Sequence, residues 1–397
     1  MREEIRDFFK FLVKLLSKLF LHIYYIFPIN NTIFFMTNMG KSYSGNPKYI
    51  YEKMITDERF KRYNIIWCFK DIEKNKNEVK KSESNKVIFI KKNNYIKFFY
   101  YILTSKILIY NCGGFSYVPI RKKQFLVETW HGGGTFKKIG LSVKNKTYFS
   151  KLGIKMASKD IKLFISSSKK FSEQTIRESM GYKGKILNSG MPRNDILFLL
   201  NKEKVCEIKQ KLNLSFDDKL ILYAPTFKGT EHNARNLDER VETLNSNLIK
   251  DELKKRYGGN WKFFVRGHQY ASNIENIDND GDWTKYPDMQ ELLLIADVLI
   301  TDYSSSMWDF AFMNKICLLY TPDINNFSEN ERGFYSPIDI WPGIQFTNNN
   351  QIKRLIENLN KKEYEKKIKQ YLTDIGSYEN GTASIKVINA LYEEIKK

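Results

Sequence analysis

The sequence has few cysteines, and they are not arranged as a metal or redox site requires. Cys68, Cys112, Cys206 and Cys317 are the only four, they lie far apart, and no CxxC pair is present. Zinc ribbons and dithiol redox motifs need closely spaced cysteines, so we expect neither. Cys68 and Cys317 lie inside apolar runs, which predicts buried, reduced thiols and fits a reducing, cytoplasmic compartment.

Common nucleotide-binding and metal-binding signatures are also missing. The chain contains no GxGxxG and no HExxH sequence. The segment Met39–Ser44 is similar to the end of a P-loop, but the first glycine is replaced by Phe35. We therefore exclude an ATP-binding P-loop and expect no metal and no cofactor.

No uninterrupted apolar run stands at the N-terminus. Residues 5–27 are mostly apolar, but Lys10, Lys14 and Lys18 interrupt them, which excludes a signal peptide and disfavours a spanning helix. The lysines recur every fourth residue, and phenylalanines and leucines cover the opposite side. This pattern predicts an amphipathic helix over residues 1–28 that lies on an anionic membrane surface with its lysines toward lipid. The alternative is a helix packed on the protein's own core.

The composition is that of a globular protein with a basic surface. A chain of 397 residues with 42% apolar content is long enough for two domains of ordinary size. Lys and Arg exceed Asp and Glu by 65 to 45, a formal net charge of +20. Nucleic acid, an anionic bilayer and a phosphate-rich substrate are the candidate partners, and charge alone does not choose among them.

Short apolar runs alternate with helical stretches, which predicts an α/β fold of two Rossmann-like domains with parallel sheets. The predicted strands are Thr32–Met36, Ile65–Phe69, Lys86–Ile90, Ile107–Tyr110, Phe125–Thr129, Leu163–Ser166, Leu220–Tyr223, Trp261–Val265, Val298–Thr301 and Ile316–Tyr320. Helices are predicted at Pro47–Thr56, Asn94–Thr104, Met289–Ala296 and Ser305–Asn314. We expect an N-terminal domain over residues 29–195, a second over 215–375 and a C-terminal helix over 376–397. Ligands bind beyond the carboxyl ends of such strands, so residues there are the candidates.

The first candidate follows the strand predicted at 125–129. His131 comes directly after it, followed by three glycines and the basic pair Lys137 and Lys138. Glycines let a ligand approach the backbone, and histidine changes charge near neutral pH. His131 is therefore a candidate base for a hydroxyl proton. The alternative is a tight turn with a structural histidine.

Two strand ends in the second half carry groups suited to phosphate. The strand 261–265 leads into Arg266-Gly267-His268, which offers a planar guanidinium fork and an imidazole donor. The strand 298–301 leads into Asp302 and three serines at a helix start, where free amides attract phosphate. The alternatives are a surface loop for the first segment and ordinary helix capping for the second.

Taken in order, these segments resemble the CDP-glycerol glycerophosphotransferase family, whose members build teichoic acids and related capsular polymers. The matching segments are Gly40–Ser44 with Asn46-Pro47, Thr129–Gly132, Gly190–Asp195, Pro225–Phe227, Arg266–His268, Thr301–Ser305 and Arg332–Phe334. One departure is that Gly133-Gly134 stand where the family more often has a Thr-Pro pair. This loop is where the acceptor should approach, so the acceptor's identity stays open.

The resemblance implies a GT-B-like pair of domains facing a cleft, attached peripherally to the cytoplasmic face of the cell membrane. It implies metal-independent attack of an acceptor hydroxyl on the β-phosphorus of CDP-glycerol or CDP-ribitol, with release of CMP. The acceptor would be a lipid-linked or polymeric glycan.

The resemblance also suggests a role for each candidate residue. His131 and His268 are the expected catalytic residues. His131 would be the general base, and His268 would contact the donor pyrophosphate. The expected donor-binding residues belong to the second domain. They are Thr226, Lys228, Arg266, Thr301, Asp302, Ser304, Ser305, Ser306 and Arg332, of which Lys228 and Arg332 lie on loops. The expected acceptor-binding residues, in the N-terminal domain, are Gly40, Lys41, Ser42, Gly132, Gly133 and Lys137.

Two other functions are compatible with parts of this pattern. A GT-B glycosyltransferase that uses a nucleotide sugar would need the same fold and the same phosphate site. A non-enzymatic binder of membrane or nucleic acid would spread positive charge over a face with exposed aromatics. Histidine and arginine at strand ends argue against the second, and we expect no nucleic-acid partner.

Overall fold

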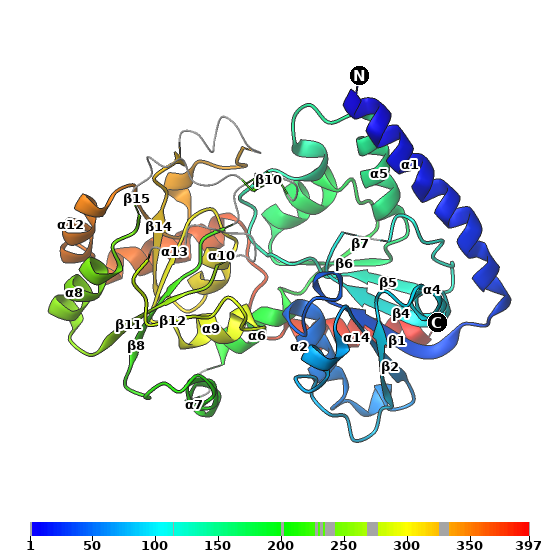
Figure 1. Ribbon diagram of the computed structural model, residues 1–397, viewed down its shortest axis with the longest axis horizontal. Helices are drawn as coiled ribbons and strands as arrows, with labels where there is room; N and C mark the ends of the chain where they lie inside the picture. The colour runs from blue at the N-terminus through cyan, green and yellow to red at the C-terminus, as the bar shows by residue number, and fades with distance from the viewer. Residues whose placement is uncertain are drawn as a thin grey trace. The chain divides into compact units, whose positions relative to one another are not determined.

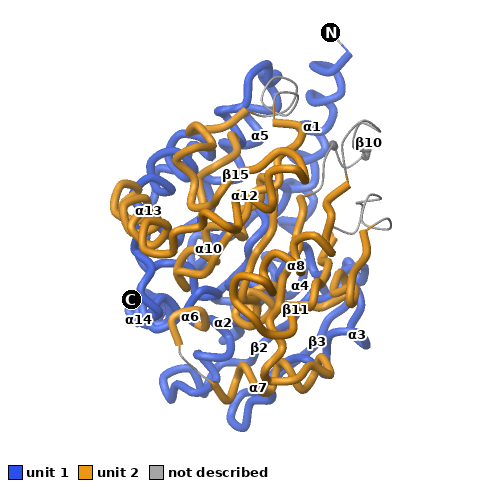
Figure 2. The backbone as a smooth tube through the Cα atoms, turned by 90° about the vertical axis from the view of Figure 1, so that its left-hand side faces the viewer, with its two compact units in different colours: residues 1–133, 139–195, 377–397 blue, residues 134–138, 196–376 orange. Residues whose placement is uncertain are grey.

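The protein is described by a computed structural model over residues 2–113, 115–199, 202–226, 229–230, 233–234, 243–267, 277–324 and 333–396. The chain divides into two compact units (Figure 2). Unit 1 comprises residues 1–133, 139–195 and 377–397, and unit 2 comprises residues 134–138 and 196–376. The predicted division differs from this one at three places, because 134–138 belongs to unit 2 and the two terminal segments, 1–28 and 377–397, belong to unit 1. The acceptor and donor roles given to the two domains stay predictions.

Unit 1 contains one parallel sheet of seven strands in the order β3-β2-β1-β4-β5-β6-β7. Its strands are β1 (Asn30–Met36), β2 (Asn64–Phe69), β3 (Val87–Lys91), β4 (Ser105–Tyr110), β5 (Phe125–Glu128), β6 (Leu163–Ser166) and β7 (Lys185–Asn188). The first six agree within two residues with the predicted strands. The edge strand β7 was missed because it is short and none of its residues is fully buried.

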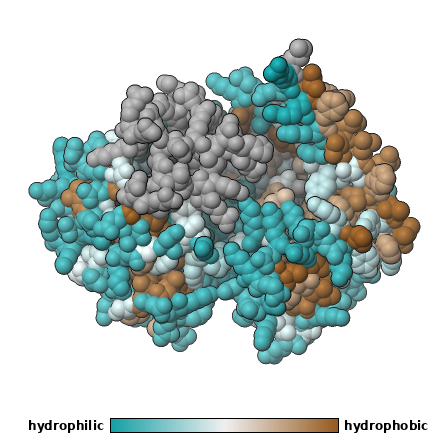
Figure 3. Space-filling model, in the orientation of Figure 1, coloured by the Kyte–Doolittle hydropathy of each residue, from teal (hydrophilic) through white to brown (hydrophobic). Residues whose placement is uncertain are grey.

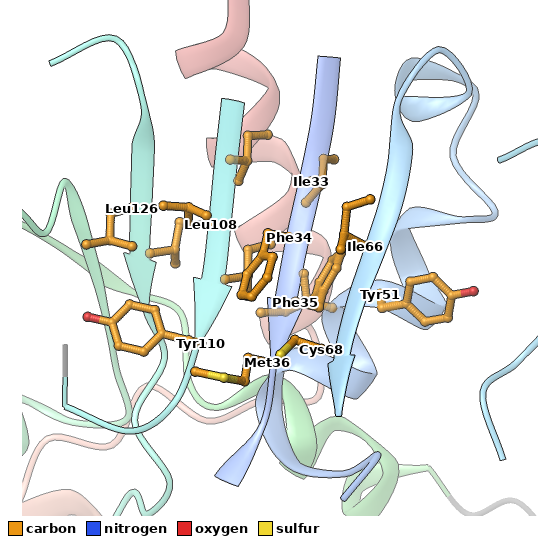
Figure 4. Packing of buried hydrophobic residues seen from close by; sticks show 14 of the residues in the cluster. Ile33, Phe34, Phe35, Met36, Tyr51, Ile66, Cys68, Leu108, Tyr110 and Leu126 are labelled. Carbon is orange, nitrogen blue, oxygen red and sulfur yellow. The ribbon is translucent and has the colours of Figure 1, made fainter. Parts of the chain in front are cut away.

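The core of unit 1 explains why its central strands read as unbroken apolar runs. Both faces of a parallel sheet are covered, so consecutive side chains on a central strand are all buried. Residues Ile33 to Met36 of β1 are nearly or fully buried and pack between side chains of β2 and β4 (Figure 4). This packing holds the carboxyl ends of β1, β4 and β5 in place, and the candidate residues of unit 1 follow those ends.

The helices of unit 1 include the one predicted over 376–397, which in the structure begins at Ala383. Their bounds are α1 (Arg2–Leu21), α2 (Gly45–Met54), α3 (Ile72–Lys76), α4 (Tyr95–Thr104), α5 (Tyr148–Lys159), a π-helix η5 (Phe171–Ser179) and α14 (Ala383–Lys396), with short 3-10 turns η1 (His22–Ile26), η2 (Asn38–Gly40), η3 (Glu58–Phe60), η4 (Gly140–Ser142) and η6 (Pro192–Asn194). Asn94 and Thr147 cap α4 and α5 by accepting hydrogen bonds from free backbone N–H groups.

Unit 2 repeats the same sheet topology. Its six-stranded parallel sheet has the order β12-β11-β8-β13-β14-β15. The strands are β8 (Lys219–Tyr223), β11 (Trp261–Val265), β12 (Gly281–Asp282), β13 (Val298–Thr301), β14 (Ile316–Tyr320) and β15 (Ile344–Phe346), and a separate pair is β9 (Gly229–Thr230) with β10 (Asn233–Ala234). Counted along each unit, the first six strands of both sheets follow the order 3-2-1-4-5-6 of dinucleotide-binding folds, which confirms the predicted Rossmann-like class.

Along the chain, the helices of unit 2 come before, between and after its strands (Figure 1). Their bounds are α6 (Asp195–Phe198), whose first residue still belongs to unit 1, α7 (Lys202–Lys211), α8 (Ser246–Tyr257), α9 (Met289–Ile295), α10 (Ser306–Ala311), α12 (Ile352–Glu357) and α13 (Lys361–Asp374), with 3-10 turns η8 (Ile338–Ile340) and η9 (Asn349–Gln351). The predicted helix over 305–314 is shorter in the structure, since α10 ends at Ala311.

Helix α1 packs along α5 (Figure 1). Two of its three lysines, Lys14 and Lys18, face the protein and not the lipid as predicted, whereas Lys10 is exposed. Lys18 donates to a carboxylate oxygen of Asp160 at 2.9 Å, and desolvation by the surrounding protein lowers the pKa of Lys14. The apolar side of the helix is exposed instead, with Leu19 at 70% and Phe20 at 84%. Within the described part of the chain, no helix is long and apolar enough to cross a membrane.

Candidate functional site

The first and fourth strands of unit 1 end in a pair of asparagines. Asn38 follows β1 and Asn111 follows β4, its neighbour in the sheet. The Asn38 N–H donates to Asn111 Oδ1 at 2.8 Å, and Asn111 Nδ2 donates to Asn38 Oδ1 at 3.2 Å. Strand order reverses at this point in the sheet, which is where ligands bind in open α/β folds.

His131 is connected to this pair through its ring. Its Nδ1 lies 3.0 Å from the carbonyl oxygen of Asn111. Because a carbonyl only accepts, Nδ1 must carry the proton, and Nε2 of the neutral ring keeps a lone pair. The side chain is exposed to solvent, although protein atoms crowd around it. That desolvation lowers the pKa of His131 below its ordinary value of 6.5, the Asn111 hydrogen bond raises it, and the charge of Arg193 lowers it further. The imidazole is therefore a reachable, neutral base at pH 7.

Glu128 supports the turn on which His131 stands. It is fully buried at the end of β5, where its two carboxylate oxygens accept from the N–H groups of Gly113 at 3.0 Å and Trp130 at 2.8 Å. Trp130 has a left-handed backbone (φ 52°), an uncommon conformation for a bulky residue, and its ring lies 4.3 Å from the ring of His131. Burial raises the pKa of Glu128 to about 8, against the lowering effect of the donated backbone N–H groups.

Two further side chains hold the backbone around His131. Arg193 donates from Nη1 to the carbonyl oxygen of His131 at 2.5 Å. Asn46 donates from Nδ2 to the carbonyl oxygens of Thr129 and Trp130, at 2.8 and 3.0 Å, and accepts from the Arg193 N–H at 3.1 Å. The turn is thus bonded on both sides by segments distant in sequence.

The residues predicted to bind the acceptor do not all lie together. Ser42 joins the network of unit 1, since Asn38 Nδ2 donates to its hydroxyl at 3.1 Å. Gly40 has φ +84° and lies against the backbone of residues 68–70, so its lack of a side chain has a structural reason. Lys41 is exposed, and Gly132 and Gly133 are buried. The sixth residue, Lys137, belongs to unit 2.

The first and fourth strands of unit 2 end in a different pair. Thr226 follows β8 and Asp302 follows β13, its neighbour in the sheet. Asp302 Oδ1 accepts from the N–H groups of Thr226 at 2.9 Å and Tyr303 at 2.7 Å. Thr301 is fully buried, and its hydroxyl donates to the Ala224 carbonyl at 2.6 Å. In this structure Thr301 joins two strands, and its predicted contact with the donor stays a prediction.

Arg266 and the serines occupy neighbouring strand ends in unit 2. Arg266 follows β11, donates from Nη2 to the Tyr286 carbonyl at 3.0 Å, and has its pKa lowered to about 10 by burial. The Ser304 hydroxyl accepts from the N–H of Ser306 at 3.2 Å, which is the capping contact offered as the alternative. Ser305 forms no side-chain capping bond.

Three predicted donor-binding residues, Lys228, His268 and Arg332, lie outside the described residues. Their roles stay predictions. Five residues around His131 were not predicted as site residues: Asn38, Asn46, Asn111, Glu128 and Arg193. Asn111 directly follows an apolar strand, and that position was the signal that could have identified it. Glu128 and Arg193 carry no such signal, because their roles depend on segments brought together by folding.

Comparisons with known proteins match the chain to one sequence family. The sequence profile of the CDP-Glycerol:Poly(glycerophosphate) glycerophosphotransferase family matches residues 19–393. A teichoic acid poly(glycerol phosphate) polymerase of Staphylococcus epidermidis is 29% identical over 384 residues, which cover 92% of this chain and 51% of the relative. A Bacillus spizizenii protein of the same name is 27% identical over 371 residues, covering 90% of this chain and 91% of the relative.

A solved structure is similar over the whole length of the chain. The wall teichoic acid polymerase TagF, as a variant soaked with CDPG, has a TM-score of 0.79 and 26% sequence identity. The match covers 100% of this chain and 98% of that one. The chain spans about half the length of the Staphylococcus epidermidis relative, so these matches differ in how much of the other protein they include.

Proposed function

The chain belongs to the CDP-glycerol:poly(glycerophosphate) glycerophosphotransferase family, and on that premise we propose that it transfers glycerol phosphate, or a related polyol phosphate, from a CDP-linked donor to a glycan acceptor. The acceptor is lipid-linked or polymeric, and the product belongs to teichoic acid or capsular polymer synthesis. The observation that carries the proposal is His131, a neutral, solvent-exposed imidazole whose Nδ1 is held by Asn111 so that Nε2 is free to act as a base.

The proposed reaction is an in-line displacement at phosphorus. The acceptor hydroxyl loses its proton to Nε2 of His131 while its oxygen attacks the β-phosphorus of the CDP-polyol. A new P–O bond forms, and the bond from the β-phosphorus to the bridging oxygen breaks. CMP leaves with the electron pair of that bond, so a phosphodiester is made without any redox change.

The polar strand ends of unit 2 are the proposed donor site. Arg266 supplies a fixed positive charge, and Thr226 and Ser304 supply hydroxyl groups. Positive charge and preorganised donors stabilise the charge that develops on the departing CMP. His268, Lys228 and Arg332 are proposed to add to this site, and no metal ion is included in the proposal.

The proposal is tested by CMP release from purified protein. CDP-glycerol and CDP-ribitol are offered separately with a lipid-linked or soluble glycan acceptor, in the presence of a chelator. We expect CMP release that depends on the acceptor and continues in the presence of the chelator. The donor that supports this release identifies the polyol. If neither CDP-polyol supports CMP release but a nucleotide sugar is consumed, the protein is a glycosyltransferase. Its product would then contain a glycosidic bond.

We also propose that the protein attaches peripherally to an anionic membrane, at its cytoplasmic face, through the outward side of α1. Figure 3 displays hydrophobic side chains gathered along the edge that α1 occupies in Figure 1. The apolar side chains of α1 and η1 with the highest exposed fractions are Leu19, Phe20, Ile23 and Ile26. An apolar helix face of this kind inserts into the boundary between headgroups and acyl chains.

The basic residues proposed to face the lipid are not the lysines of α1. Arg121 donates to the carbonyl oxygens of Tyr24 and Phe27, and so lies against the end of η1. Beside it, Lys122 and Lys123 are exposed and line an open pocket of ≈ 400 Å³. Basic residues near an anionic bilayer contribute about 1 kcal/mol each to binding.

Sedimentation with vesicles tests the attachment. We expect the protein to pellet with phosphatidylglycerol vesicles, more weakly with phosphatidylcholine, and much less after the double substitution of Leu19 and Phe20 by Glu. Lys122→Glu with Lys123→Glu should weaken binding to the anionic vesicles alone. Ile385→Glu, on α14, is the matched control because it also replaces an exposed apolar side chain. Equal pelleting of all variants would contradict the attachment through α1.

A further inference from the structure

The loop that begins at His131 contributes residues to both compact units. Residues through Gly133 belong to unit 1, and residues 134–138 belong to unit 2. Within unit 2 this segment forms backbone hydrogen bonds with residues 333–335. The Lys138 N–H donates to the Gly333 carbonyl at 3.0 Å, and the Tyr335 N–H donates to the Phe136 carbonyl at 2.9 Å.

Side-chain packing fixes the segment in unit 2. Phe136 is only 3% exposed, and its ring centroid lies 4.8 Å from that of Trp341 and 6.5 Å from that of Tyr371. A Cβ at Gly134 would meet the Phe136 ring at 2.3 Å and the Cβ of Trp308 at 3.0 Å. Close packing, and not contact with a ligand, therefore requires glycine at position 134.

This packing directs Lys137 toward the polar strand ends of unit 2. Its Nζ donates to the Thr226 hydroxyl at 3.5 Å and lies 5.9 Å from the ring centroid of Tyr303. The N–H groups of Thr226 and Tyr303 both donate to Asp302. Lys137 thus contacts residues that follow the first and fourth strands of the sheet, β8 and β13.

We infer that Lys137 binds a phosphate oxygen of the CDP-linked donor together with the Thr226 hydroxyl, and does not bind the acceptor. The inference rests on the proposed function, because it names a ligand of that same donor. An ammonium group is a compact point charge that suits a diphosphate. The cation stabilises the negative charge that CMP acquires as the bridging P–O bond breaks.

Lys137→Met removes the ammonium and keeps the aliphatic chain, so the packing of Phe136 should survive. We expect the dissociation constants for CDP and CDP-glycerol, measured by calorimetry, to rise about tenfold or more, as for loss of a charge-assisted hydrogen bond. The KM for the donor should rise in parallel, and the KM for the acceptor should stay within about twofold. Lys137→Arg should restore part of the donor affinity.

Lys138→Met is the matched control, since Lys138 is the adjacent lysine of the same segment, and it should keep wild-type donor affinity. Unchanged thermal unfolding of Lys137→Met without ligand shows that the fold is intact. The assignment of Lys137 would be overturned if the wild-type protein and Lys137→Met bound CDP with equal dissociation constants. It would also be overturned if Lys137→Met raised the KM for the acceptor alone. A wild-type protein that binds no CDP-polyol would overturn the proposed function itself, and with it this inference.

Discussion

The two units end their first and fourth strands in different chemical groups on the same backbone topology. In unit 1, Asn38 and Asn111 exchange amide hydrogen bonds, and the Asn111 carbonyl orients the His131 ring. In unit 2, the Asp302 carboxylate accepts the N–H of Thr226, whose hydroxyl accepts from a lysine.

The proposed function assigns a different task to each of these two sets of strand ends. A network of neutral amides adds no charge that would protonate a nearby imidazole, so it suits a base. A hydroxyl and cations suit a ligand with several phosphate oxygens, while the Asp302 carboxylate holds the backbone by accepting the N–H groups of Thr226 and Tyr303. The strand order determines which strand ends lie next to each other in the sheet. The residues just after each strand determine the chemistry at those ends.

The largest expected effect is the loss of turnover when His131 is replaced, without a loss of donor affinity. His131→Ala should lower kcat by about two to four orders of magnitude, the usual cost of removing a general base. Donor affinity should remain, because the proposed donor site lies on unit 2. CMP release measures the first quantity, and calorimetry with CDP-glycerol measures the second. Near-normal turnover in His131→Ala would contradict the role of unit 1 as the source of the base.

The next effect concerns the buried carboxyl group beneath the His131 turn. Burial raises the pKa of Glu128 to about 8 from an ordinary 4.5, so the folded protein holds a proton there that the unfolded chain has released. This contribution to stability is fully present below pH 4.5 and is lost as the pH rises to about 8, by at most about 1.4 kcal/mol per pH unit. Glu128→Gln should remove this slope from the dependence of Tm on pH.

Glu83→Gln is the control for that experiment, because Glu83 is an exposed glutamate of the same unit. It should leave the slope unchanged. Glu128→Gln should also lower activity, since an amide supplies one oxygen where the Gly113 and Trp130 N–H groups use two. An unchanged pH slope in Glu128→Gln would show that Glu128 is not protonated in the folded protein.

A smaller effect tests how the neutral state of His131 is maintained. Desolvation by the surrounding protein lowers the pKa of His131, and the charge of Arg193 lowers it further. Arg193→Gln should therefore move the acidic limb of the kcat/KM profile to higher pH, with a larger loss of activity on that limb than above pH 7. Arg59→Gln, which removes a surface arginine paired with Asp57, should leave the limb in place. A shift toward lower pH would contradict the role of Arg193.

The smallest effect sharpens the comparison inside unit 2. Thr301→Val removes a buried hydroxyl that donates to the Ala224 carbonyl, and should cost about 1 kcal/mol of stability. Donor affinity should change by less than about twofold. Thr226→Val should instead weaken donor binding, because its hydroxyl lies beside the Lys137 ammonium. If Thr301→Val weakens CDP binding as much as Thr226→Val, Thr301 contacts the donor as the sequence predicted.

Much of the fold could be predicted from the sequence, because central strands of parallel sheets are unbroken apolar runs. Trp261–Val265, Val298–Thr301 and Ile316–Tyr320 were predicted with the bounds that the structure has. The edge strand β7 was not, since partial exposure leaves no such run. The direction in which Lys14 and Lys18 of α1 point could not be predicted, because which side of a helix packs on the protein depends on its neighbour, here α5.

The sequence alone determined the fold class, the family and the strand ends at which His131, Arg266 and Asp302 stand. These are properties of local order along the chain, where a buried strand is followed directly by polar residues. Only the tertiary structure decided that Asn111 orients His131, that Glu128 and Arg193 support its turn, and that Lys137 belongs with Thr226. The physical reason is that hydrogen bonds and packing at these positions join segments far apart in sequence, and no pattern of adjacent residues records such contacts.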